Sequence, residues 1–450
     1  MTSTKGGFSG SALKKILAAC LDQGVALKVA YSGGVDSHVL LHALCSARVP
    51  WPIAAIHIDH GLHPQSRQWA RHCQQVCQKL DVSCTIEQLE IVDVRGAGVE
   101  ATARRMRYAR LAHHVGRADV LLTAHHLDDQ AETVLLQLVR GSGVRGLAAM
   151  SEITPFAGGQ LMRPLLGFAR EQLLTYASSH NLKWIEDSSN KELHYNRNFV
   201  RHRALPLLEE RWPQVRQALT RAAHHAAEAS LLLDALAADD LQVAQAVDQA
   251  GLSVSALLRF LPERQRNMLR YWMRQKGFGA PSREQLQRIL DIAQHPTRSS
   301  HATLTWPGAE LHRYRDTLYV MAPLARPDPT LTVSWNPAEP LALPGTGYII
   351  RTVQAVGEGL SRERIAGHML TVRLRKGGET CRLPGRRHRH SLKKLLQEAG
   401  VPPWERLRLP LVFVNDELAA VADRWVCVPF DACANEPALK VVVERADHPA

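Results

Sequence analysis

The sequence predicts an α/β protein in which a doubly wound, mainly parallel sheet is followed by a helical domain and a small α+β domain. Between residues 25 and 123, short apolar runs alternate with amphipathic stretches of helical period, which is typical of parallel strands joined by crossover helices. The chain has 450 residues, and single hydrophobic cores stop growing at roughly 250 to 300 residues. Two or three domains are therefore expected.

The apolar runs have the length of strands, and the stretches between them carry apolar residues at helical spacing. The expected strands are 25–31, 53–58, 84–91 and 119–123. The expected helices between them are 36–47, 65–80 and 100–115. This order predicts a Rossmann-like sheet, which binds its ligands at the carboxyl ends of the strands.

The composition changes after residue 211. Ala, Leu, Gln and Arg dominate as far as residue 294 and predict packed helices, and a short β-like stretch follows at 302–321. Six prolines then fall between Pro323 and Pro344, where neither a helix nor a central strand can continue. We expect a catalytic domain at 1–212, a mainly helical domain at 213–325, a linker at 326–347 and a basic α+β domain at 348–450.

The net charge of +12 and a pI near 9.5 favour a polyanionic partner. Between Leu370 and Pro410, eleven Lys and Arg residues stand against three Glu, which gives a local net charge of +8. A charge run is usually a solvated face, but this density on one small domain favours RNA contact, with Trp404 as a stacking group. The expected RNA-binding side chains are Arg382, Arg386, Arg387, Arg389, Lys393 and Lys394.

The cysteines and the apolar runs bear on the cellular compartment. Eight cysteines are scattered without a Cys-x-x-Cys pair, which favours reduced thiols in a cytoplasm. No run of 18 apolar residues is present, and the first 15 residues are polar and rich in Gly and Ser, so neither a membrane anchor nor an export signal is expected. We expect a cytoplasmic protein with no membrane partner.

A loop of distinctive composition lies between the first expected strand and the helix after it. It reads Ser32, Gly33, Gly34, Val35, Asp36 and Ser37. Adjacent glycines let the backbone approach a phosphate, and the free amides at the helix N-terminus supply partial positive charge. No lysine follows the glycines, so this is not the lysine-containing P-loop. A plain strand-to-helix turn would also tolerate Gly-Gly, but the full pattern in this context favours a pyrophosphate site.

Acidic residues begin the helix that is expected after the fourth strand. Asp128 and Glu132 are four residues apart, and Asp129 and Glu132 three apart, so their carboxylates can share neighbouring surface. They could bind an ammonium group or a magnesium ion. The alternative is simple helix-terminal charge, because acidic residues in a first turn are favoured by the macrodipole.

Two histidine clusters look superficially like metal sites. One contains His57 and His60 with Asp59, and the other contains His125 and His126. Neither has the ligand spacing of a zinc site, so transition-metal binding is not expected. For each histidine taken singly, a structural role is the expectation.

Arginines in two further segments are candidates for phosphate contacts. Arg104 and Arg107 lie one turn apart, and a fixed guanidinium near developing negative charge would stabilise a transition state. Arg107 is the stronger candidate, because Arg104 could equally form a solvated pair with Glu100. Arg197 and Arg201 share a helix face and would contact RNA phosphate or form a solvated cationic face.

A glycine-rich segment imitates the dinucleotide-binding fingerprint. Gly141, Gly143 and Gly146 have the Gly-x-Gly-x-x-Gly spacing, but they follow an expected helix rather than a strand. Dinucleotide binding is therefore not expected. We interpret the segment as a loop near the active site, flanked by Arg140 and Arg145.

The loop at 32–37 resembles the pyrophosphate motif of the N-type ATP pyrophosphatases, the PP-loop proteins, which split ATP into AMP and pyrophosphate. Segments 57–62, 100–108, 124–143, 187–201 and 383–385 are in turn similar to the bacterial tRNA(Ile)-lysidine synthetases. The similarity covers nearly the whole chain. One departure is Ser188, where many members of the family carry Glu.

The resemblance implies an ATP-dependent C–N ligase that joins free L-lysine to C2 of the wobble cytidine in the CAU anticodon of an isoleucine tRNA. It implies ATP and Mg²⁺ as cofactors, an adenylated tRNA intermediate, release of pyrophosphate and AMP, and a change of codon reading from AUG to AUA. It further implies that Asp36 holds Mg²⁺ and phosphate, that Arg107 steadies phosphate charge, and that Asp129 with Glu132 receives the lysine ammonium or its proton. The resemblance leaves a homodimer open.

Two other functions compete with this interpretation. A tRNA 2-thiolation enzyme would share the loop but needs a reactive cysteine pair or an iron–sulfur site, which the spacing of Cys73 and Cys77 does not supply. An ATP-gated RNA-binding protein without catalysis would have no need of the carboxylates and arginines described above.

Overall fold

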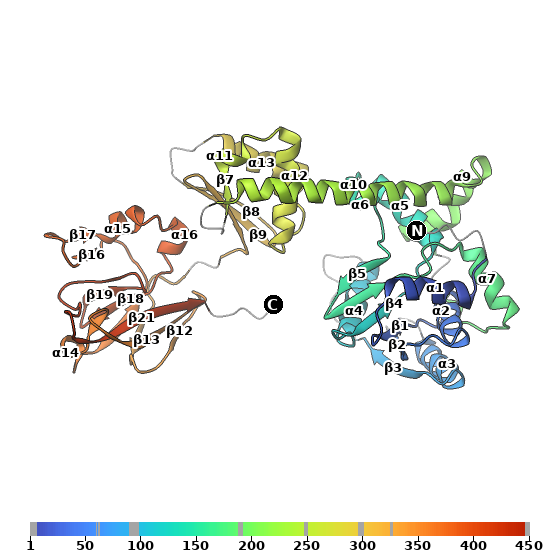
Figure 1. The fold of residues 1–450 in the computed structure, drawn as a ribbon, viewed down its shortest axis with the longest axis horizontal. Coiled ribbons are helices and arrows are strands. Elements are labelled where there is room, and N and C mark those ends of the chain that lie inside the picture. The colour runs from blue at the N-terminus through green and yellow to red at the C-terminus, as the bar shows by residue number, and fades with distance from the viewer. Residues whose placement is uncertain are drawn as a thin grey trace. The chain divides into compact units, whose positions relative to one another are not determined.

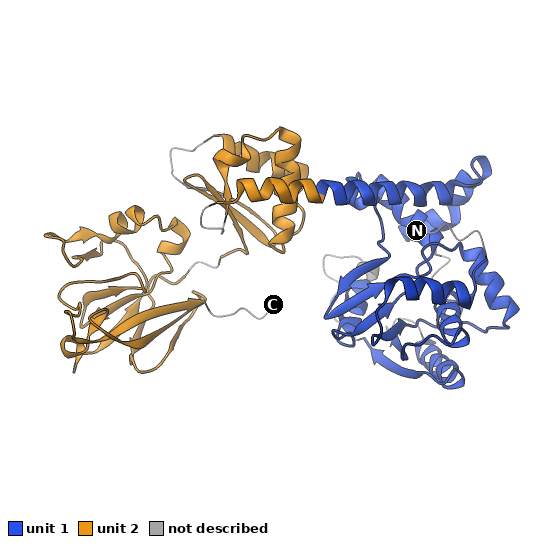
Figure 2. Cartoon of the chain, in the orientation of Figure 1, with its two compact units in different colours: residues 1–233 blue, residues 234–450 orange. Residues whose placement is uncertain are grey.

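The computed structural model describes residues 7–59, 61, 64–89, 99–187, 192–246, 251–295, 301–324 and 327–445. The chain forms two compact units, residues 1–233 and residues 234–450 (Figure 2). Each unit has its own hydrophobic core, and each is described by itself.

The first unit is built on a six-stranded sheet with the order β3-β2-β1-β4-β6-β5 (Figure 1). Its strands are β1 (Ala26–Ala30), β2 (Ile53–Asp59), β3 (Ser83–Gln88), β4 (Asp119–Leu122), β5 (Ile153–Phe156) and β6 (Gly159–Met162). Neighbouring strands are parallel except for β5 against β6. The four expected strands and the doubly wound class are confirmed. The strand order reverses between β1 and β4, which creates a crevice at their carboxyl ends.

Helices cover the sheet as the apolar periodicity predicts. They are α1 (Gly10–Cys20), α2 (Val35–Ser46), α3 (Ser66–Lys79), α4 (Val99–Ala112), α5 (Leu127–Val139), α6 (Val144–Leu147) and α7 (Arg170–Ser179). The main core contains fully buried residues from β1, α1 and α2, among them Leu27, Leu13 and Leu40. The glycine-rich segment follows α5, a helix rather than a strand, and leads into the short helix α6.

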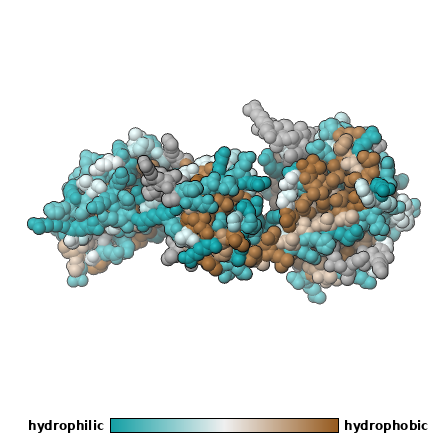
Figure 3. All heavy atoms as spheres, turned by 90° about the horizontal axis from the view of Figure 1, so that it is seen from above, coloured by the Kyte–Doolittle hydropathy of each residue, from teal (hydrophilic) through white to brown (hydrophobic). Residues whose placement is uncertain are grey.

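After α7 the chain forms α8 (Asn196–Phe199), a π-helical turn η2 (Val200–Ala204), α9 (Leu205–Arg211) and the long helix α10 (Val215–Ala244). Several apolar side chains of this region are exposed: Leu207, Trp212, Leu231 and Leu232 are each more than half accessible. Figure 3 shows hydrophobic areas on the surface of the first unit, at the right of the view. No helix in the described part of the chain is long and apolar enough to cross a bilayer.

The second unit begins with the end of α10 and packs three helices on a small antiparallel sheet. The helices are α11 (Val254–Leu257), α12 (Pro262–Gln275) and α13 (Arg283–Gln294). The strands are β7 (Leu252–Ser253), β8 (His301–Trp306), β9 (Ala309–Tyr314) and β10 (Thr317–Met321), in the order β7-β10-β9-β8. The β-like stretch expected at 302–321 is confirmed as three of these strands.

The C-terminal part of the second unit contains a five-stranded and a four-stranded antiparallel sheet. The first is β11 (Thr332–Trp335), β15 (Leu370–Arg373), β18 (Leu411–Val414), β19 (Glu417–Val421) and β20 (Trp425–Val426), in chain order. The second is ordered β12 (Leu341–Leu343), β13 (Tyr348–Val356), β21 (Pro437–Arg445) and β14 (Leu360–Ser361). Smaller elements are β16 (Thr380–Cys381), β17 (His390–Ser391), α14 (Arg362–Ile365), α15 (Leu392–Glu398) and α16 (Pro403–Arg406).

The segment expected to be a linker, 326–347, contributes strands to both sheets. β11 and β12 lie there, and each occupies the edge of its sheet. Proline lacks a backbone N–H and is therefore compatible with edge strands, although not with central ones. The proline density correctly excluded a central strand but did not reveal the edge pairing.

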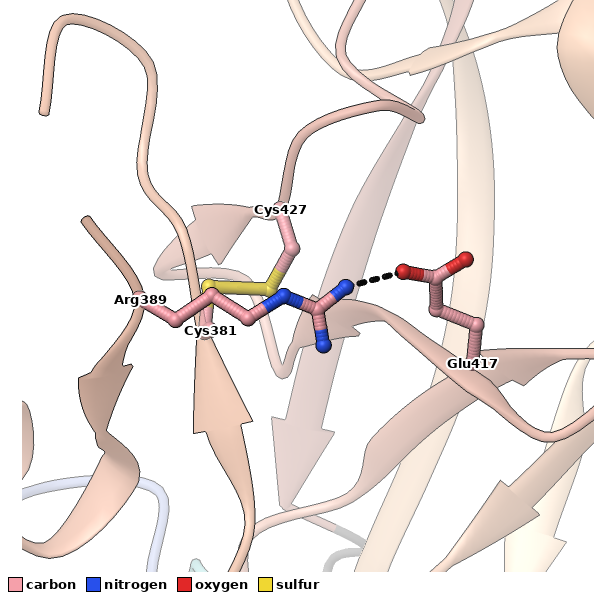
Figure 4. Close-up of a disulfide and its surroundings, with 4 residues drawn as sticks. All are labelled: Cys381, Arg389, Glu417 and Cys427. Atoms are coloured by element: carbon pink, nitrogen blue, oxygen red, sulfur yellow. Dashed lines mark hydrogen bonds and ion pairs between the residues drawn. A yellow bond between two sulfur atoms is a disulfide. The ribbon is translucent and has the colours of Figure 1, made fainter. Parts of the chain in front are cut away.

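The cysteines depart from the expectation of reduced thiols. Cys381 and Cys427 form a disulfide, while the other six cysteines are free (Figure 4). Both half-cystines are buried in a hydrophobic cluster with residues of α15, such as Leu392 and Leu396. They lie 46 residues apart in sequence, so no local pattern could have predicted the pair.

We expect this disulfide to stabilise the second unit measurably. Closing a loop of 46 residues removes chain entropy from the unfolded state worth about 4 kcal/mol. Replacing Cys381 and Cys427 together by serine should therefore lower the free energy of unfolding by about 2 to 4 kcal/mol in a denaturant titration. Cys20 is an exposed free thiol of the first unit, and it provides the control. The variant Cys20→Ser should leave the free energy of unfolding of the second unit unchanged. Titration of eight reactive thiols in the denatured, unreduced protein would contradict the disulfide.

Candidate active site

The loop between β1 and α2 has the backbone that a phosphate cradle requires. Gly33 has φ +83°, a conformation that favours glycine. A Cβ at this position would lie 2.5 Å from Ile185 Cδ1 and 2.8 Å from Cys73 Sγ. The Gly33 carbonyl also accepts a hydrogen bond from Ile185 N at 3.0 Å. The side of the loop that faces Ile185 and Cys73 is therefore packed and fixed. The opposite side of the loop is open to a ligand.

Serine hydroxyls shape the front of the loop. Ser37 Oγ donates to Gly34 O at 3.0 Å and accepts from Ser32 N at 3.2 Å, and the two serine oxygens lie 3.0 Å apart. Gly34 is the N-cap residue of α2 and offers no side-chain cap, so the first amides of the helix are left to a ligand. An anion is favoured at such a helix N-terminus.

A cavity of about 670 Å³ opens beside this loop. It lies at the carboxyl ends of β1, β2 and β4, where doubly wound sheets bind ligands. The predicted site residues that line it are Ser32, Gly34, Asp36, Ser37 and Arg107, together with three residues of the histidine clusters, His57, Asp59 and His125. Asp129, Glu132, Arg197 and Arg201 are not among its lining residues. His60 and Ser188 lie outside the described residues, as does the side chain of Glu100.

Asp36 connects the loop to a buried histidine. Its carboxylate lies 3.7 Å from His126 Nε2 and 4.0 Å from Arg170 Nε. His126 is 1% exposed and also approaches Asp128 at 3.5 Å and Asp129 at 3.3 Å. Burial opposes the charged imidazolium, but the surrounding carboxylates outweigh it and raise the pKa of His126 to about 10. No sequence pattern singled out His126 as a cation, because the carboxylates around it meet only in the folded structure.

Asp129 and Glu132 are paired with the two arginines that were expected to contact RNA. Arg197 contacts Asp129 at 2.9 Å and Glu132 at 2.8 Å, and Arg201 contacts the same two carboxylates at 2.9 and 2.6 Å. The Glu132 side chain is completely buried. The two carboxylates and the two guanidinium groups are thus paired with one another inside the domain. A lysine ammonium at Asp129 and Glu132, or an RNA phosphate at Arg197 and Arg201, would have to compete with these contacts.

Arg107 lies in the cavity with Tyr108 and His125. Its Cζ atom is 5.6 Å from the centroid of the Tyr108 ring. Burial lowers the pKa of Arg107, and repulsion from Arg104 and Arg197 adds to the shift. His125 is held by Thr123, whose hydroxyl lies 2.9 Å from Nδ1. Burial lowers the pKa of His125 to about 3, so its ring is neutral near pH 7 and serves as a hydrogen-bonding group.

The acidic side chains suit magnesium better than a transition metal. Within the described residues, no group of three or more His, Cys, Asp or Glu side chains could hold a metal ion by itself. Asp36 Oδ1, however, is buried beside the phosphate cradle and has no hydrogen-bond partner in the part of the chain that the structure describes. A single carboxylate next to phosphate oxygens fits Mg²⁺, which is usually bound by one or two carboxylates together with substrate phosphates.

The basic side chains of the C-terminal part are exposed, as RNA contact requires. All six expected residues, from Arg382 to Lys394, lie on the surface. Arg389 forms an ion pair with Glu417 (Figure 4), and Arg386 approaches Glu398 at 3.5 Å. Trp404 does not present a free stacking face, because its ring packs 4.3 Å from His312 and 5.3 Å from Tyr319. The expectation for Trp404 is thereby corrected.

Two further arginines of the first unit lie near the candidate active site, and neither was predicted from the sequence. Arg216 on α10 contacts Asp128 at 2.9 Å and Glu209 at 2.6 Å, which ties the long helix to α5. Arg163 directly follows β6 at the carboxyl end of the sheet. The glycine pair Gly158 and Gly159 between two short apolar runs was the available signal for the β5–β6 hairpin.

Comparison with known proteins agrees with this geometry. Residues 9–208 match a family model described as PP-loop domain, residues 252–319 a TilS substrate binding domain, and residues 370–443 a TilS substrate C-terminal domain. The fold and the phosphate cradle therefore define an ATP-using ligase of the PP-loop class.

Curated relatives narrow the class further. The tRNA(Ile)-lysidine synthase of Coxiella burnetii is 41% identical over 419 residues, with 92% of each chain covered. That of Alkalilimnicola ehrlichii is 43% identical over 423 residues, with 93% of each chain covered. The chain belongs to the tRNA(Ile)-lysidine synthase family.

Solved structures show more distant likeness. The U34-tRNA thiolase NcsA from Methanococcus maripaludis is 20% identical, with a TM-score of 0.41, and the match covers 49% of this chain and 78% of the thiolase. A crystal structure of a TilS C-terminal domain is also 20% identical, with a TM-score of 0.21, and the match covers 26% of this chain and 98% of that domain.

Proposed function

We propose that the enzyme joins the ε-amine of free L-lysine to C2 of the wobble cytidine in the CAU anticodon of an isoleucine tRNA, so that the tRNA reads AUA instead of AUG. The observation that carries the proposal is the cavity at the β1/β4 crevice, which unites the phosphate cradle with Arg107 and His125. The identity of the RNA substrate and of the product is inferred from the family to which the chain belongs.

In the first step, the C2 carbonyl oxygen of the cytosine attacks the α-phosphate of ATP, and pyrophosphate leaves. The amides of α2 and the hydroxyls of Ser32 and Ser37 hold the departing phosphates, and Arg107 neutralises charge on the transferred group. Mg²⁺ held by Asp36 would screen the phosphate charge. The oxygen of C2 becomes part of a phosphate ester, which is a far better leaving group.

In the second step, the lysine amine attacks C2, and AMP carries the oxygen away. The cavity is also lined by carboxylates that form no ion pair with Arg197 or Arg201 in the described part of the chain, among them Asp59 and Glu192. We assign the lysine ammonium to this acidic wall rather than to Asp129 and Glu132. These last two hold Arg197 and Arg201 in place, and an incoming ammonium would have to break contacts of 2.6 to 2.9 Å.

The decisive experiment gives the protein ATP, Mg²⁺, labelled lysine and total bacterial tRNA. We expect label in one isoleucine tRNA, at the wobble nucleotide. Absence of tRNA-bound label would refute the proposal. A second incubation without lysine, with ATP labelled in its α-phosphate, should leave label on the tRNA. Label on lysine in the absence of tRNA would show instead that lysine is the group that is adenylated.

The competing function, ATP-gated RNA binding without catalysis, is separated by Asp36→Ala. If Asp36 holds Mg²⁺ and phosphate, this variant loses pyrophosphate exchange but keeps its affinity for tRNA, because its basic C-terminal surface is intact. If the wild-type protein shows no pyrophosphate exchange, the non-catalytic function is favoured.

A further inference from the structure

Arg163 occupies a position on the binding edge of the sheet that the mechanism above does not use. β6 is parallel to β4, so the residue after β6 lies at the same edge as the ATP cavity. Arg163 Nη1 donates to Ser151 O at 2.7 Å, and its backbone N donates to Glu152 O at 2.8 Å. Its Nε atom is buried and has no hydrogen-bond partner among the described residues. The side chain is thus held in place with donor capacity left over.

The side chain of Tyr108 lies close to Arg163 and to two more arginines. Arg104 Cζ lies 5.1 Å from the centroid of the Tyr108 ring, and Arg107 Cζ lies 5.6 Å from it. Tyr108 also interacts with Arg163, since burial lowers the pKa of Arg163 and the Tyr108 side chain opposes that effect. The ring itself is fixed by an edge contact with Phe156, at 6.0 Å between centroids. Three guanidinium groups therefore converge on one aromatic side chain.

These cations repel one another. Burial lowers the pKa of Arg163, and the charge of Arg104 lowers it further. The same arginines lower the pKa of His125, after the larger effect of burial. No carboxylate of the described residues forms an ion pair with Arg104, Arg107 or Arg163, in contrast to the paired Arg197. Concentrated like charge is unfavourable in the free protein, and a bound anion would relieve it.

We propose that Arg104 and Arg163 bind a backbone phosphate of the RNA substrate, next to the nucleotide whose base enters the cavity. The proposal rests on the function proposed above. ATP phosphates have their own cradle at the β1–α2 loop, and Arg107 lines the cavity beside it. Arg104 and Arg163 belong to the same cluster but do not line that cavity, and Arg104 is exposed. They are therefore placed to bind a phosphate that stays outside the cavity while the base of the neighbouring nucleotide enters it.

Steady-state kinetics and salt dependence test the assignment. Arg163→Gln and Arg104→Gln should each raise KM for tRNA about tenfold, because a charge-assisted contact to phosphate is worth about 1.5 kcal/mol. KM for ATP and for lysine should change less than twofold. A plot of log affinity for tRNA against log salt concentration should become less steep by about 0.7 for each lost contact with single-stranded RNA. Arg163→Lys, which keeps the charge, should recover the salt slope.

Arg117→Gln is the matched control. Arg117 is exposed and precedes β4, at the opposite edge of the sheet, so its loss should change neither KM nor the salt slope. A rise in KM for ATP with an unchanged salt slope for tRNA would assign the cluster to ATP phosphate and overturn the proposal. The salt slope is measured on tRNA binding alone, so it decides the assignment even if the wild-type protein forms no lysidine.

Discussion

Gly33→Ala is expected to abolish pyrophosphate exchange, with a loss of at least about a hundredfold, and to destabilise the first unit. A non-glycine residue at φ +83° costs about 1 to 3 kcal/mol. The added methyl group would also meet Ile185 Cδ1 at 2.5 Å and Cys73 Sγ at 2.8 Å, and such overpacking costs about 1 to 3 kcal/mol more. The loop can relieve the clash only by moving the amides that hold phosphate. Exchange kinetics and thermal unfolding measure the two effects.

Gly34→Ala separates the two effects. Gly34 has an ordinary φ of −72°, and an added Cβ would come no closer than 3.5 Å to another heavy atom, the Ser32 oxygen. The melting temperature of this variant should therefore match that of the wild type, although its phosphate affinity will fall if the methyl group reaches the ligand. If Gly33→Ala kept wild-type stability and exchange, the loop would not be packed against Ile185 and Cys73 as described.

Glu132→Gln is expected to lower the free energy of unfolding of the first unit by about 3 kcal/mol and to inactivate the enzyme. Removing one partner of a buried ion pair typically costs about 3 to 5 kcal/mol, since the remaining charges stay buried and uncompensated. Glu132 has no exposed surface and binds both Arg197 and Arg201. The two guanidinium groups would then share Asp129 alone. Chemical denaturation and lysidine formation report the two consequences.

Glu209→Gln provides the comparison for this prediction. Glu209 is also doubly hydrogen-bonded to an arginine, Arg216, at 2.6 and 3.0 Å, but about a third of its side chain is exposed. Pairs of this kind contribute about 1 kcal/mol or less. Equal destabilisation by the two variants would show that the burial of Glu132 has no energetic consequence. Full activity of Glu132→Gln would show that the arginine network does not support the site.

The architecture of the first unit could be predicted because its signals are local. Strands of parallel sheets are short apolar runs, and the helices between them carry a 3.6-residue period, so both patterns are complete within a few residues. β11 and β12 were missed because edge strands in a proline-rich segment lack that pattern. The disulfide between Cys381 and Cys427 was missed because its partners meet only through the tertiary fold.

The residues of the candidate site also fall into those that local sequence predicts and those that only the fold brings together. The phosphate cradle could be predicted from adjacent residues of one loop, and the structure places Arg107 beside it in the cavity. The pairing of Glu132 with Arg197 could not, because 65 residues separate them and a free carboxylate and a paired one look alike in a sequence. Arg163 was missed for a related reason, since its importance depends on which end of the sheet it occupies.

The π-helical turn η2 has a consequence for insertions and deletions in this helix. Pro206 has no N–H and would clash with the carbonyl four residues before it, which explains why the helix widens here. The Leu205 amide bonds to Val200 O, five residues back, and both side chains are buried against Ala131. Removing one residue from 200–204 would restore ordinary helical geometry but turn everything after it by about 100°. A deletion in this turn is therefore expected to disturb the first unit more than a substitution at one of its exposed positions.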